Sequence, residues 1–546
     1  MAWLRKIIEK IEDAPTGFFF WLSSFLSIIA LRLLIENWLD FLRSRSGLFI
    51  FYEFTHTFLF FLIAYIVIVE FLKRILKSTY QKISNILLLG YFMILTPPIL
   101  DYFISGGQGF WSFYKFDSLT GLFWRFLTFF GDKPEIGITY GVRIEVALAI
   151  IFIFAYIFLK SKKIILSFLG AIGAYAIFFV LGTFPSWITI AFEGFSKGFL
   201  NVGEIDTAEL FLSPVRLFSR EIPEILSSLN IKMSIMFALF LTGLVFLGLF
   251  LNYKERLIAF LKNARLPQII YHFGLLSAGA GLALKLNNSD WGISFFNIFA
   301  FFLVAESVIL AWLSSVVAND IIDRKIDEET NSFRPLIKNI FSEKNYAAIG
   351  IMLFFVSILF SAIVSFKIAL LFLIYHALAW IYSMWPLRLK RFPFVSTFVS
   401  ALASLMIFIS GFVFTSPNQS IRSLPFSIIA LLVISLTLSL PIKDFKDIEG
   451  DKNDGVETIP VFFGEYWGKV IVAGGVFLSF LLSVVFLNEP RLFWWALALG
   501  GFSFWAIINM EKENGGPVTC RNIFWWMLGN VSVYGLILVK IIFFTN

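Results

Sequence analysis

The chain is divided from end to end into apolar segments of about 20 residues, the length that an α-helix needs to cross a bilayer. Six segments come before residue 253, near 17–36, 48–72, 84–104, 141–160, 163–193 and 230–252. Nine more follow, near 268–287, 293–319, 345–366, 367–385, 395–415, 425–443, 466–487, 490–510 and 521–544. Because lipid cannot satisfy backbone polar groups, we expect an all-α polytopic membrane protein.

Composition excludes a water-soluble domain, since 59% of the 546 residues are hydrophobic and 15% are charged. The net charge of +7 comes from short basic clusters between apolar runs, which argues against a nucleic-acid partner and for the lipid bilayer. A single cysteine cannot form an intramolecular disulfide, and three histidines cannot build a His-rich metal site. Any metal is therefore expected to be bound by oxygen atoms.

The sixth apolar segment is followed by a basic stretch that contains a proline, over residues 253–267. We interpret it as a cytoplasmic linker. It would separate an N-terminal polytopic membrane domain of unknown function, residues 1–252, from a second membrane domain, residues 268–546. No internal repeat joins the two halves.

Basic residues indicate the membrane orientation, because cytoplasmic loops carry an excess of Lys and Arg. If the N-terminus is cytoplasmic, all the basic connections fall inside, near residues 73–82, 160–163, 254–265, 324–344, 388–391 and 443–452. We therefore predict a multi-pass protein with a cytoplasmic N-terminus. The ends of the second and sixth segments of the C-terminal half would face the same side.

The first of these two ends carries an acidic cluster. Asn319, Asp323 and Asp327 are spaced i, i+4 and i+8, so on a continuing helix they would form one stripe. All three would then face one cavity.

A second acidic cluster follows the sixth segment. Asp444, Asp447 and Asp451 are spaced i, i+3 and i+7, which again gives one acidic face. Two groups of carboxylates repel each other near hydrocarbon unless cations neutralise them. Mg²⁺ suits this need, since it bridges a few carboxylates to substrate phosphates. The two clusters are thus expected to hold a diphosphate between them.

Basic side chains accompany both clusters and are candidates for binding the diphosphate. They are Arg334, Arg388, Lys390, Lys443 and Lys446. For any one of them the positive-inside rule is an equal explanation, because it predicts basic residues at this membrane face in any case.

Three motifs, in this order, resemble the UbiA family of intramembrane prenyltransferases, over about residues 265–546. The first is Asn319-Asp320-x-x-Asp323-x-x-x-Asp327 followed by Arg334-Pro335, and the second runs from Tyr382 to Lys390. The third is Asp444-x-x-Asp447-x-Glu449-Gly450-Asp451, followed by Thr458-Ile459-Pro460 and Gly464. The N-terminal half lies outside the resemblance.

The resemblance implies a nine-helix bundle around a central cavity that binds Mg²⁺ and a prenyl diphosphate. Carried over by position, the metal contacts would be Asn319, Asp323, Asp447 and Asp451, with Asp327 and Asp444 close by. All five aspartates are candidate catalytic residues, and Asn319 is also a candidate for binding the diphosphate. The implied reaction is ionisation of the allylic carbon–oxygen bond, followed by attack of a lipophilic acceptor on the carbocation.

The form of the third motif looks closest to branches that alkylate a geranylgeranylglyceryl phosphate lipid or chlorophyllide. An acceptor of the ether-lipid kind is our first expectation, and an aromatic or tetrapyrrole acceptor is the alternative. Residues 328–333, between Asp327 and Arg334, depart from the commoner Asn-Arg-Pro pattern, so the branch stays open. A cation-binding transporter and an inactive scaffold are alternatives of another class. The position of both clusters at one membrane face, accompanied by Arg and Lys, favours phosphate chemistry over transport. The presence of both clusters intact argues against an inactive scaffold.

In the N-terminal half, Glu53 and His56 are spaced i, i+3, as in half of a carboxylate-bridged metal site. No second such pair exists, and we interpret them as a polar contact or as residues at the membrane interface. The long stretches 104–140 and 194–229 are expected to contain helices that lie on the membrane surface.

Overall fold

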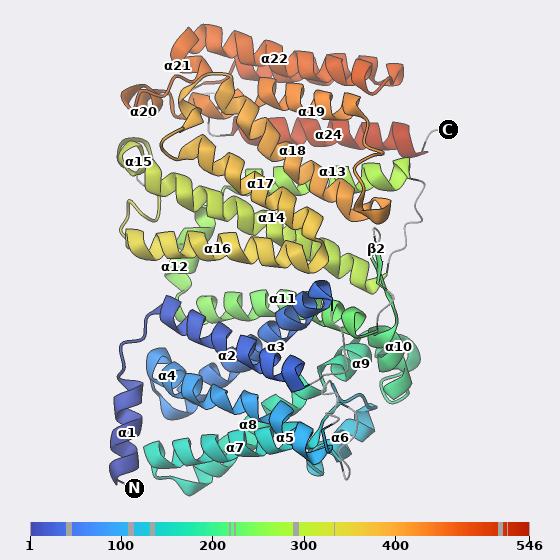
Figure 1. The fold of residues 1–546 in the computed structure, drawn as a ribbon. Coiled ribbons are helices and arrows are strands. Elements are labelled where there is room, and N and C mark those ends of the chain that lie inside the picture. Colours follow the sequence, from blue (N-terminus) through green and yellow to red (C-terminus); the bar gives the residue numbers. More distant parts are fainter. Residues whose placement is uncertain are drawn as a thin grey trace. The chain divides into compact units, whose positions relative to one another are not determined.

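The computed structural model describes residues 2–39, 46–107, 114–131, 137–217, 220–222, 225–287, 294–331, 333–511, 517–520 and 522–544. Within them the fold is built of helices, with one two-stranded sheet, β1 (Val215–Leu217) and β2 (Arg220–Ile222) (Figure 1). The chain forms two compact units, one of Met1–Val215 with Ile222–Leu241 and one of Arg216–Glu221 with Thr242–Asn546. The predicted all-α architecture is confirmed.

Unit 1 consists of ten helices, a 3₁₀ turn and the first part of α11 (Ile225–Asn252) within its described residues. They are α1 (Ala2–Glu12), α2 (Phe18–Leu39), α3 (Gly47–Leu76), α4 (Tyr80–Gly90), η1 (Tyr91–Leu95), α5 (Thr96–Ile104), α6 (Leu119–Leu127), α7 (Tyr140–Ser161), α8 (Ile164–Gly182), α9 (Phe184–Lys197) and α10 (Glu204–Leu212). Every apolar segment predicted before residue 253 is helical.

Two of these predicted segments are interrupted, and each interruption lies next to proline. The segment predicted over residues 163–193 ends as α8 at Gly182 and restarts as α9, with Pro185 in its first turn. The segment predicted over residues 84–104 tightens into η1 before Pro97 and Pro98 of α5. Proline has no N–H to donate to the preceding turn, so it is tolerated in a first turn and breaks a continuous helix.

Unit 2 contains the second part of α11 and the helices that follow it. They are α12 (Lys254–Lys262), α13 (Leu266–Leu286), α14 (Phe295–Ile322), α15 (Arg324–Thr330), α16 (Glu343–Val364), α17 (Phe366–Ser383), η2 (Leu389–Arg391), α18 (Val395–Thr415), η3 (Pro417–Gln419), α19 (Phe426–Ser439), η4 (Leu440–Lys446), α20 (Ile448–Asn453), α21 (Ile459–Phe463), α22 (Glu465–Phe486), η5 (Pro490–Leu492), α23 (Phe493–Ile508) and α24 (Ile523–Phe544). The nine predicted segments after residue 268 correspond to α13, α14, α16, α17, α18, α19, α22, α23 and α24.

The long helices carry large apolar side chains on their outer faces, such as Phe355, Leu370 and Leu536. In the described part of the chain, fourteen stretches are long and apolar enough to cross a membrane. They include all nine predicted after residue 268 and five of the six predicted before it; the sixth is α3, a helix of 30 residues. The chain is an integral, multi-pass membrane protein.

Helices α13 and α18 of unit 2 approach each other closely at two glycines. A Cβ atom on Gly411 would lie 1.9 Å from the carbonyl oxygen of Leu276, and one on Gly279 would lie 2.0 Å from that of Phe408. Small residues allow such close approach of backbones in membrane bundles.

The variant Gly411→Ala is therefore expected to force α13 and α18 apart and to destabilise the protein by about 1–3 kcal/mol, as overpacked cores do. Gly274→Ala on α13 is the matched control, because its Cβ would meet no atom within 4 Å. Thermal unfolding of the purified variants in detergent measures the difference. Equal unfolding temperatures for the two variants would contradict the expectation.

Candidate active site

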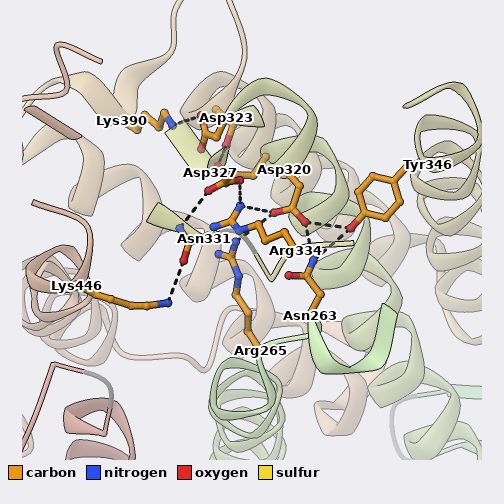
Figure 2. A network of polar contacts seen from close by, with 12 residues as sticks. Asn263, Arg265, Asp320, Asp323, Asp327, Asn331, Arg334, Tyr346, Lys390 and Lys446 are labelled. Atoms are coloured by element: carbon orange, nitrogen blue, oxygen red, sulfur yellow. Dashed lines mark hydrogen bonds and ion pairs between the residues drawn. The ribbon is translucent and has the colours of Figure 1, made fainter. Parts of the chain in front are cut away.

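The first acidic cluster lies where α14 ends, and the helix does not continue through it. Asp323 leaves helical geometry (φ −90°, ψ 13°), and the short α15 begins at the next residue. The predicted single stripe of Asn319, Asp323 and Asp327 is thus corrected. The break turns the two aspartates toward different cations (Figure 2).

Asp327 faces Arg334, which also binds Asp320. The guanidinium of Arg334 donates to Asp320 over 2.6 Å and forms a short ion pair with Asp327, while the side-chain amide of Asn331 donates to Asp327 over 3.2 Å. All three charged side chains are at least nine-tenths buried. Burial raises the pKa of Asp327 to about 7, although Arg334 opposes the shift.

Asp320 is the most enclosed carboxylate of the cluster and was not a predicted site residue. Besides Arg334 it accepts hydrogen bonds from the Asn263 amide (2.6 Å), the Tyr346 hydroxyl (3.0 Å) and Arg265 (3.4 Å). Asn263 and Arg265 come from the segment between α12 and α13, and Tyr346 from α16. Asp320 of α14 therefore connects this helix to the segment between α12 and α13 and to α16 (Figure 2).

Asp323 faces the other way, toward the segment after α17. Lys390 forms a short ion pair with its carboxylate, and Arg388 donates to the same oxygen over 3.2 Å. Arg388 also binds Asp454 over 2.5 Å, a residue that the sequence did not single out. The Nε atom of Arg388 is buried and has no hydrogen-bond partner in the described part of the chain. Asn319 accepts a hydrogen bond from Ser383 (3.1 Å) on the neighbouring α17.

The second acidic cluster also lies beyond the end of its helix. The sixth segment was expected to run to residue 443, but α19 ends at Ser439, next to Pro441, and the chain tightens into the 3₁₀ helix η4. Asp447 separates η4 from the short α20, which carries Asp451. The three aspartates thus come from a 3₁₀ turn, a junction and a new helix.

The aspartates of the second cluster lie farther from basic side chains than the aspartates of the first cluster do. The carboxylates of Asp444, Asp447 and Asp451 make no hydrogen bond or ion pair with the described residues. Burial, together with the nearby charges of Asp444, Asp447 and Asp323, raises the pKa of Asp451 to about 8, although Lys390 opposes the shift. Asp451 thus lies within the electric field of Asp323.

Other contacts join the two clusters. Helix α15 packs on α20, and the ammonium group of Lys446 donates to the side-chain oxygen of Asn331 over 3.4 Å. Lys443 donates to the hydroxyl of Tyr382 over 3.0 Å. The structure therefore brings both clusters and their accompanying basic residues to one end of unit 2. Arg334 and Lys446 lie on the side of Asp327, and Lys390 lies on the side of Asp323 (Figure 2). Arg388 also contacts Asp323.

The donor chemistry of the site fits Mg²⁺. In the described part of the chain, no three Asp, Glu, His or Cys side chains converge closely enough to hold an ion by themselves. Mg²⁺ commonly binds with one or two carboxylates, several waters and substrate phosphates, so it does not require such a cage. Three half-buried carboxylates without a hydrogen bond or ion pair supply suitable oxygen ligands.

The chain is similar to curated proteins over part of its length. Over 189 residues, 34% of the chain, it is 28% identical to the digeranylgeranylglyceryl phosphate synthase of Methanosphaera stadtmanae and covers 64% of that protein. Over 134 residues, 24% of the chain, it is 31% identical to the chloroplastic chlorophyll synthase of Avena sativa and covers 34% of it. The chain thus spans less than two thirds of either relative.

A solved structure matches a larger share of the chain. A UbiA homolog from Archaeoglobus fulgidus, bound to GPP and Mg²⁺, matches 52% of this chain and 99% of its own, with 20% identity and a TM-score of 0.40. Residues 274–528 match the model of the UbiA prenyltransferase family, and they contain both acidic clusters and the basic residues described above. The C-terminal half of this chain therefore belongs to the UbiA prenyltransferase family.

Proposed function

We propose that unit 2 transfers a prenyl group from an isoprenoid diphosphate to a lipophilic acceptor, with the help of Mg²⁺. The observation that carries the proposal is the asymmetry between the clusters. Asp323 is neutralised by Arg388 and Lys390, while Asp444, Asp447 and Asp451 have no ion-pair partner in the described chain. Such a site has cations for phosphate oxygens and free carboxylates for a metal ion.

Asn319, Asp323, Asp447 and Asp451 are the residues that we assign to the metal. When bound, Mg²⁺ would neutralise the negative charge of the diphosphate. The ligand assignment is consistent with the electrostatics, because a cation among these carboxylates relieves the repulsion that Asp451 experiences from its neighbours.

Arg388 and Lys390 are positioned to bind the diphosphate, since each already contacts a carboxylate oxygen of Asp323 at the centre of the site. Lys443 and Lys446 extend the basic surface. Arg334 remains a predicted diphosphate ligand. Its contacts with Asp320 and Asp327, however, support a role in positioning the carboxylates of the first cluster. In the reaction, the diphosphate leaves with the bonding electron pair. The acceptor then attacks the allylic cation and loses a proton.

For the acceptor we propose a glycerol-phosphate ether lipid. The third motif, Asp444-x-x-Asp447-x-Glu449-Gly450-Asp451, supports this choice, as does the name of the Methanosphaera relative. The Avena relative, named chlorophyll synthase, keeps a tetrapyrrole acceptor as the alternative. With a cytoplasmic N-terminus, the site would open to the cytoplasmic face, where soluble prenyl diphosphates are available.

The test is transfer of labelled geranylgeranyl diphosphate into organic-extractable product by the purified protein and a lipid extract, with and without Mg²⁺. We expect product only with Mg²⁺, and its mass identifies the acceptor. Geranylgeranylglyceryl phosphate and chlorophyllide, supplied separately, distinguish the two acceptor classes. Folded protein that binds no prenyl diphosphate of any chain length would refute the proposal.

Loss of Arg388 is expected to act mainly on substrate binding. A charge-assisted hydrogen bond contributes about 1.5–3 kcal/mol, so Arg388→Ala should raise KM for the prenyl diphosphate by about tenfold to a hundredfold, with a smaller change in kcat. Arg391→Ala is the control, because its guanidinium lies 4.7 Å from the Trp385 ring centroid and has no ion pair in the described chain. If both variants shift KM alike, general loss of positive charge explains the effect instead.

A further inference from the structure

Unit 1 contains a cavity of about 340 Å³ that the prenyl-transfer proposal does not use. It lies among α2, α3, the α4–α5 segment, α7 and the beginning of α11, all within this unit. Its volume falls within the range of small-molecule sites in proteins. No motif in the sequence predicted it.

The cavity has a polar end and an apolar end. On α7, Glu145 lies near the start of the helix, and Phe152 follows two turns later, about 10 Å away at 1.5 Å per residue. On α3, His56 comes near the start, and Phe60 and Ile68 follow deeper. In the α4–α5 segment, the apolar residues Leu87 and Ile94 precede Asp101, and α2 contributes Arg32 and Glu36 to the polar end. A ligand that fills the cavity would therefore be amphiphilic.

The charged groups at the polar end come from separate helices and are organised around Arg32. Its guanidinium lies 3.2 Å from Glu36 and 3.7 Å from Glu145, and it donates to the carbonyl oxygen of Ile94 over 3.0 Å. Asp101 accepts hydrogen bonds from the hydroxyl of Thr139 (2.5 Å) and the backbone N–H of Gly141 (2.8 Å). These contacts hold charged side chains within predicted membrane-spanning segments. Charged side chains in such segments cost free energy to bury and usually serve a function.

Two features of this end indicate the chemistry of a ligand. In the described lining, Arg32 is the only Lys or Arg, against the four carboxylates of Glu36, Glu53, Asp101 and Glu145. The lining therefore disfavours a phosphate and offers acceptors for hydrogen-bond donors. Asn230 also lines the cavity, is 8% exposed, and makes no hydrogen bond with the described chain. Since buried amides are normally satisfied, Asn230 is available to a ligand.

Side chains of the connecting segments also line the cavity. Tyr114, whose hydroxyl shares a hydrogen bond with His56, lines the cavity together with Phe130 and Ile138. The contact confirms the polar interpretation of His56. Nearby, Phe103 on α5 and Trp124 on α6 are 74% and 64% exposed, as expected of helices at a membrane interface. Residues 108–113 and 132–136 of the predicted surface stretch lie outside the described residues.

We propose that this cavity binds an amphiphile with an apolar chain and a head group that donates hydrogen bonds and carries no negative charge. Hydroxyl and ammonium groups share this chemistry. The site is thus distinct in specificity from the diphosphate site of unit 2, and the proposal does not depend on prenyl transfer.

The test uses the full chain in nanodiscs and a photoreactive diazirine analogue of 1-oleoylglycerol, with labelled positions mapped by mass spectrometry. Unlabelled 1-oleoylglycerol, sphingosine and 1-oleoylglycerol 3-phosphate compete for labelling. We expect labels on α3, α5 and α7, and competition by the phosphate at least about tenfold weaker than by one of the others. If sphingosine competes more strongly, the ligand of the cavity has an amino head group. If 1-oleoylglycerol competes more strongly, the head group is hydroxylated.

Variants distinguish the cavity from the lipid-facing surface. Ala149→Phe fills the cavity and is expected to abolish labelling, whereas Ala147→Phe, on the same helix but outside the lining, should retain it. Asn230→Leu, of similar volume, should weaken binding by about three- to tenfold through loss of one hydrogen bond. Equal competition by the phosphate, or labelling unchanged in both Ala149→Phe and Asn230→Leu, would overturn the proposal. Asp323→Ala is expected to leave labelling unchanged even if it abolishes prenyl transfer.

Discussion

Replacing Asp447 by asparagine is expected to lower Mg²⁺-dependent prenyl transfer by about a hundred- to a thousandfold, the loss typical of removing one preorganised charge partner from an active site. Asp447 lies at the junction of η4 and α20, and its carboxylate makes no hydrogen bond or ion pair within the described chain. Its loss therefore removes a metal ligand without breaking a structural contact. The expected result is an inactive protein of unchanged stability.

Initial rates at saturating Mg²⁺, together with the unfolding temperature, measure this prediction. Glu449→Gln provides the control, because Glu449 is exposed and lies two residues away in the same motif. Asp323→Ala should also abolish transfer, although it additionally leaves Arg388 and Lys390 without their shared carboxylate. Asp447→Asn protein with full activity would remove the second cluster from the proposed chemistry.

The largest effect on stability is expected at Arg334. Its guanidinium connects Asp320 and Asp327, whose side chains are 1% and 3% exposed. Arg334→Ala would leave both carboxylates buried without this charge, and breaking a buried pair in this way costs about 3–5 kcal/mol. We expect a large fall in unfolding temperature, and activity lost along with the fold.

Cys520 makes the measurement simple, because it is the only cysteine and packs against the core of unit 2. A maleimide dye that fluoresces on reaction reports its exposure during heating. The triple variant Arg334→Ala, Asp320→Asn, Asp327→Asn should regain much of the lost stability, since neither buried carboxylate remains without its partner and Arg265, which also contacts Asp320, is partly exposed. If Arg334→Ala alone unfolds at the wild-type temperature and only raises KM, then Arg334 binds the diphosphate rather than fixing the cluster.

The sequence was sufficient to predict the nine apolar helices that follow residue 268 in the described chain, and to place an acidic cluster near the end of two of them. The apolar segments are long enough to span a bilayer, so their helical structure hardly depends on contacts with distant parts of the chain. The acidic motifs lie at the ends of these segments. The positions of the helix breaks were harder to predict. Pro441 was a readable signal for the end of α19, whereas Asp323 ends α14 without a proline or glycine.

Partners far apart in the chain could not be predicted. Asn263 and Arg265 bind Asp320 across 57 and 55 residues, and they come from the stretch interpreted as a linker. Arg388 meets Asp454 across 66 residues. Neither contact leaves a local pattern, because each depends on how the helices pack. The domain boundary at 253–267 stays a prediction, while the division into compact units falls between Leu241 and Thr242, inside α11.

That division has a practical consequence for separating the two halves. Helix α11 runs without interruption from Ile225 to Asn252, and Thr242, on its second part, donates a short hydrogen bond to Glu306 of α14. A gene fragment that starts at the sequence-derived boundary of residue 253 would delete this donor and leave a glutamate facing lipid or an empty groove. A fragment that starts before Ile225 retains the whole helix and is the better choice for producing the prenyltransferase half alone.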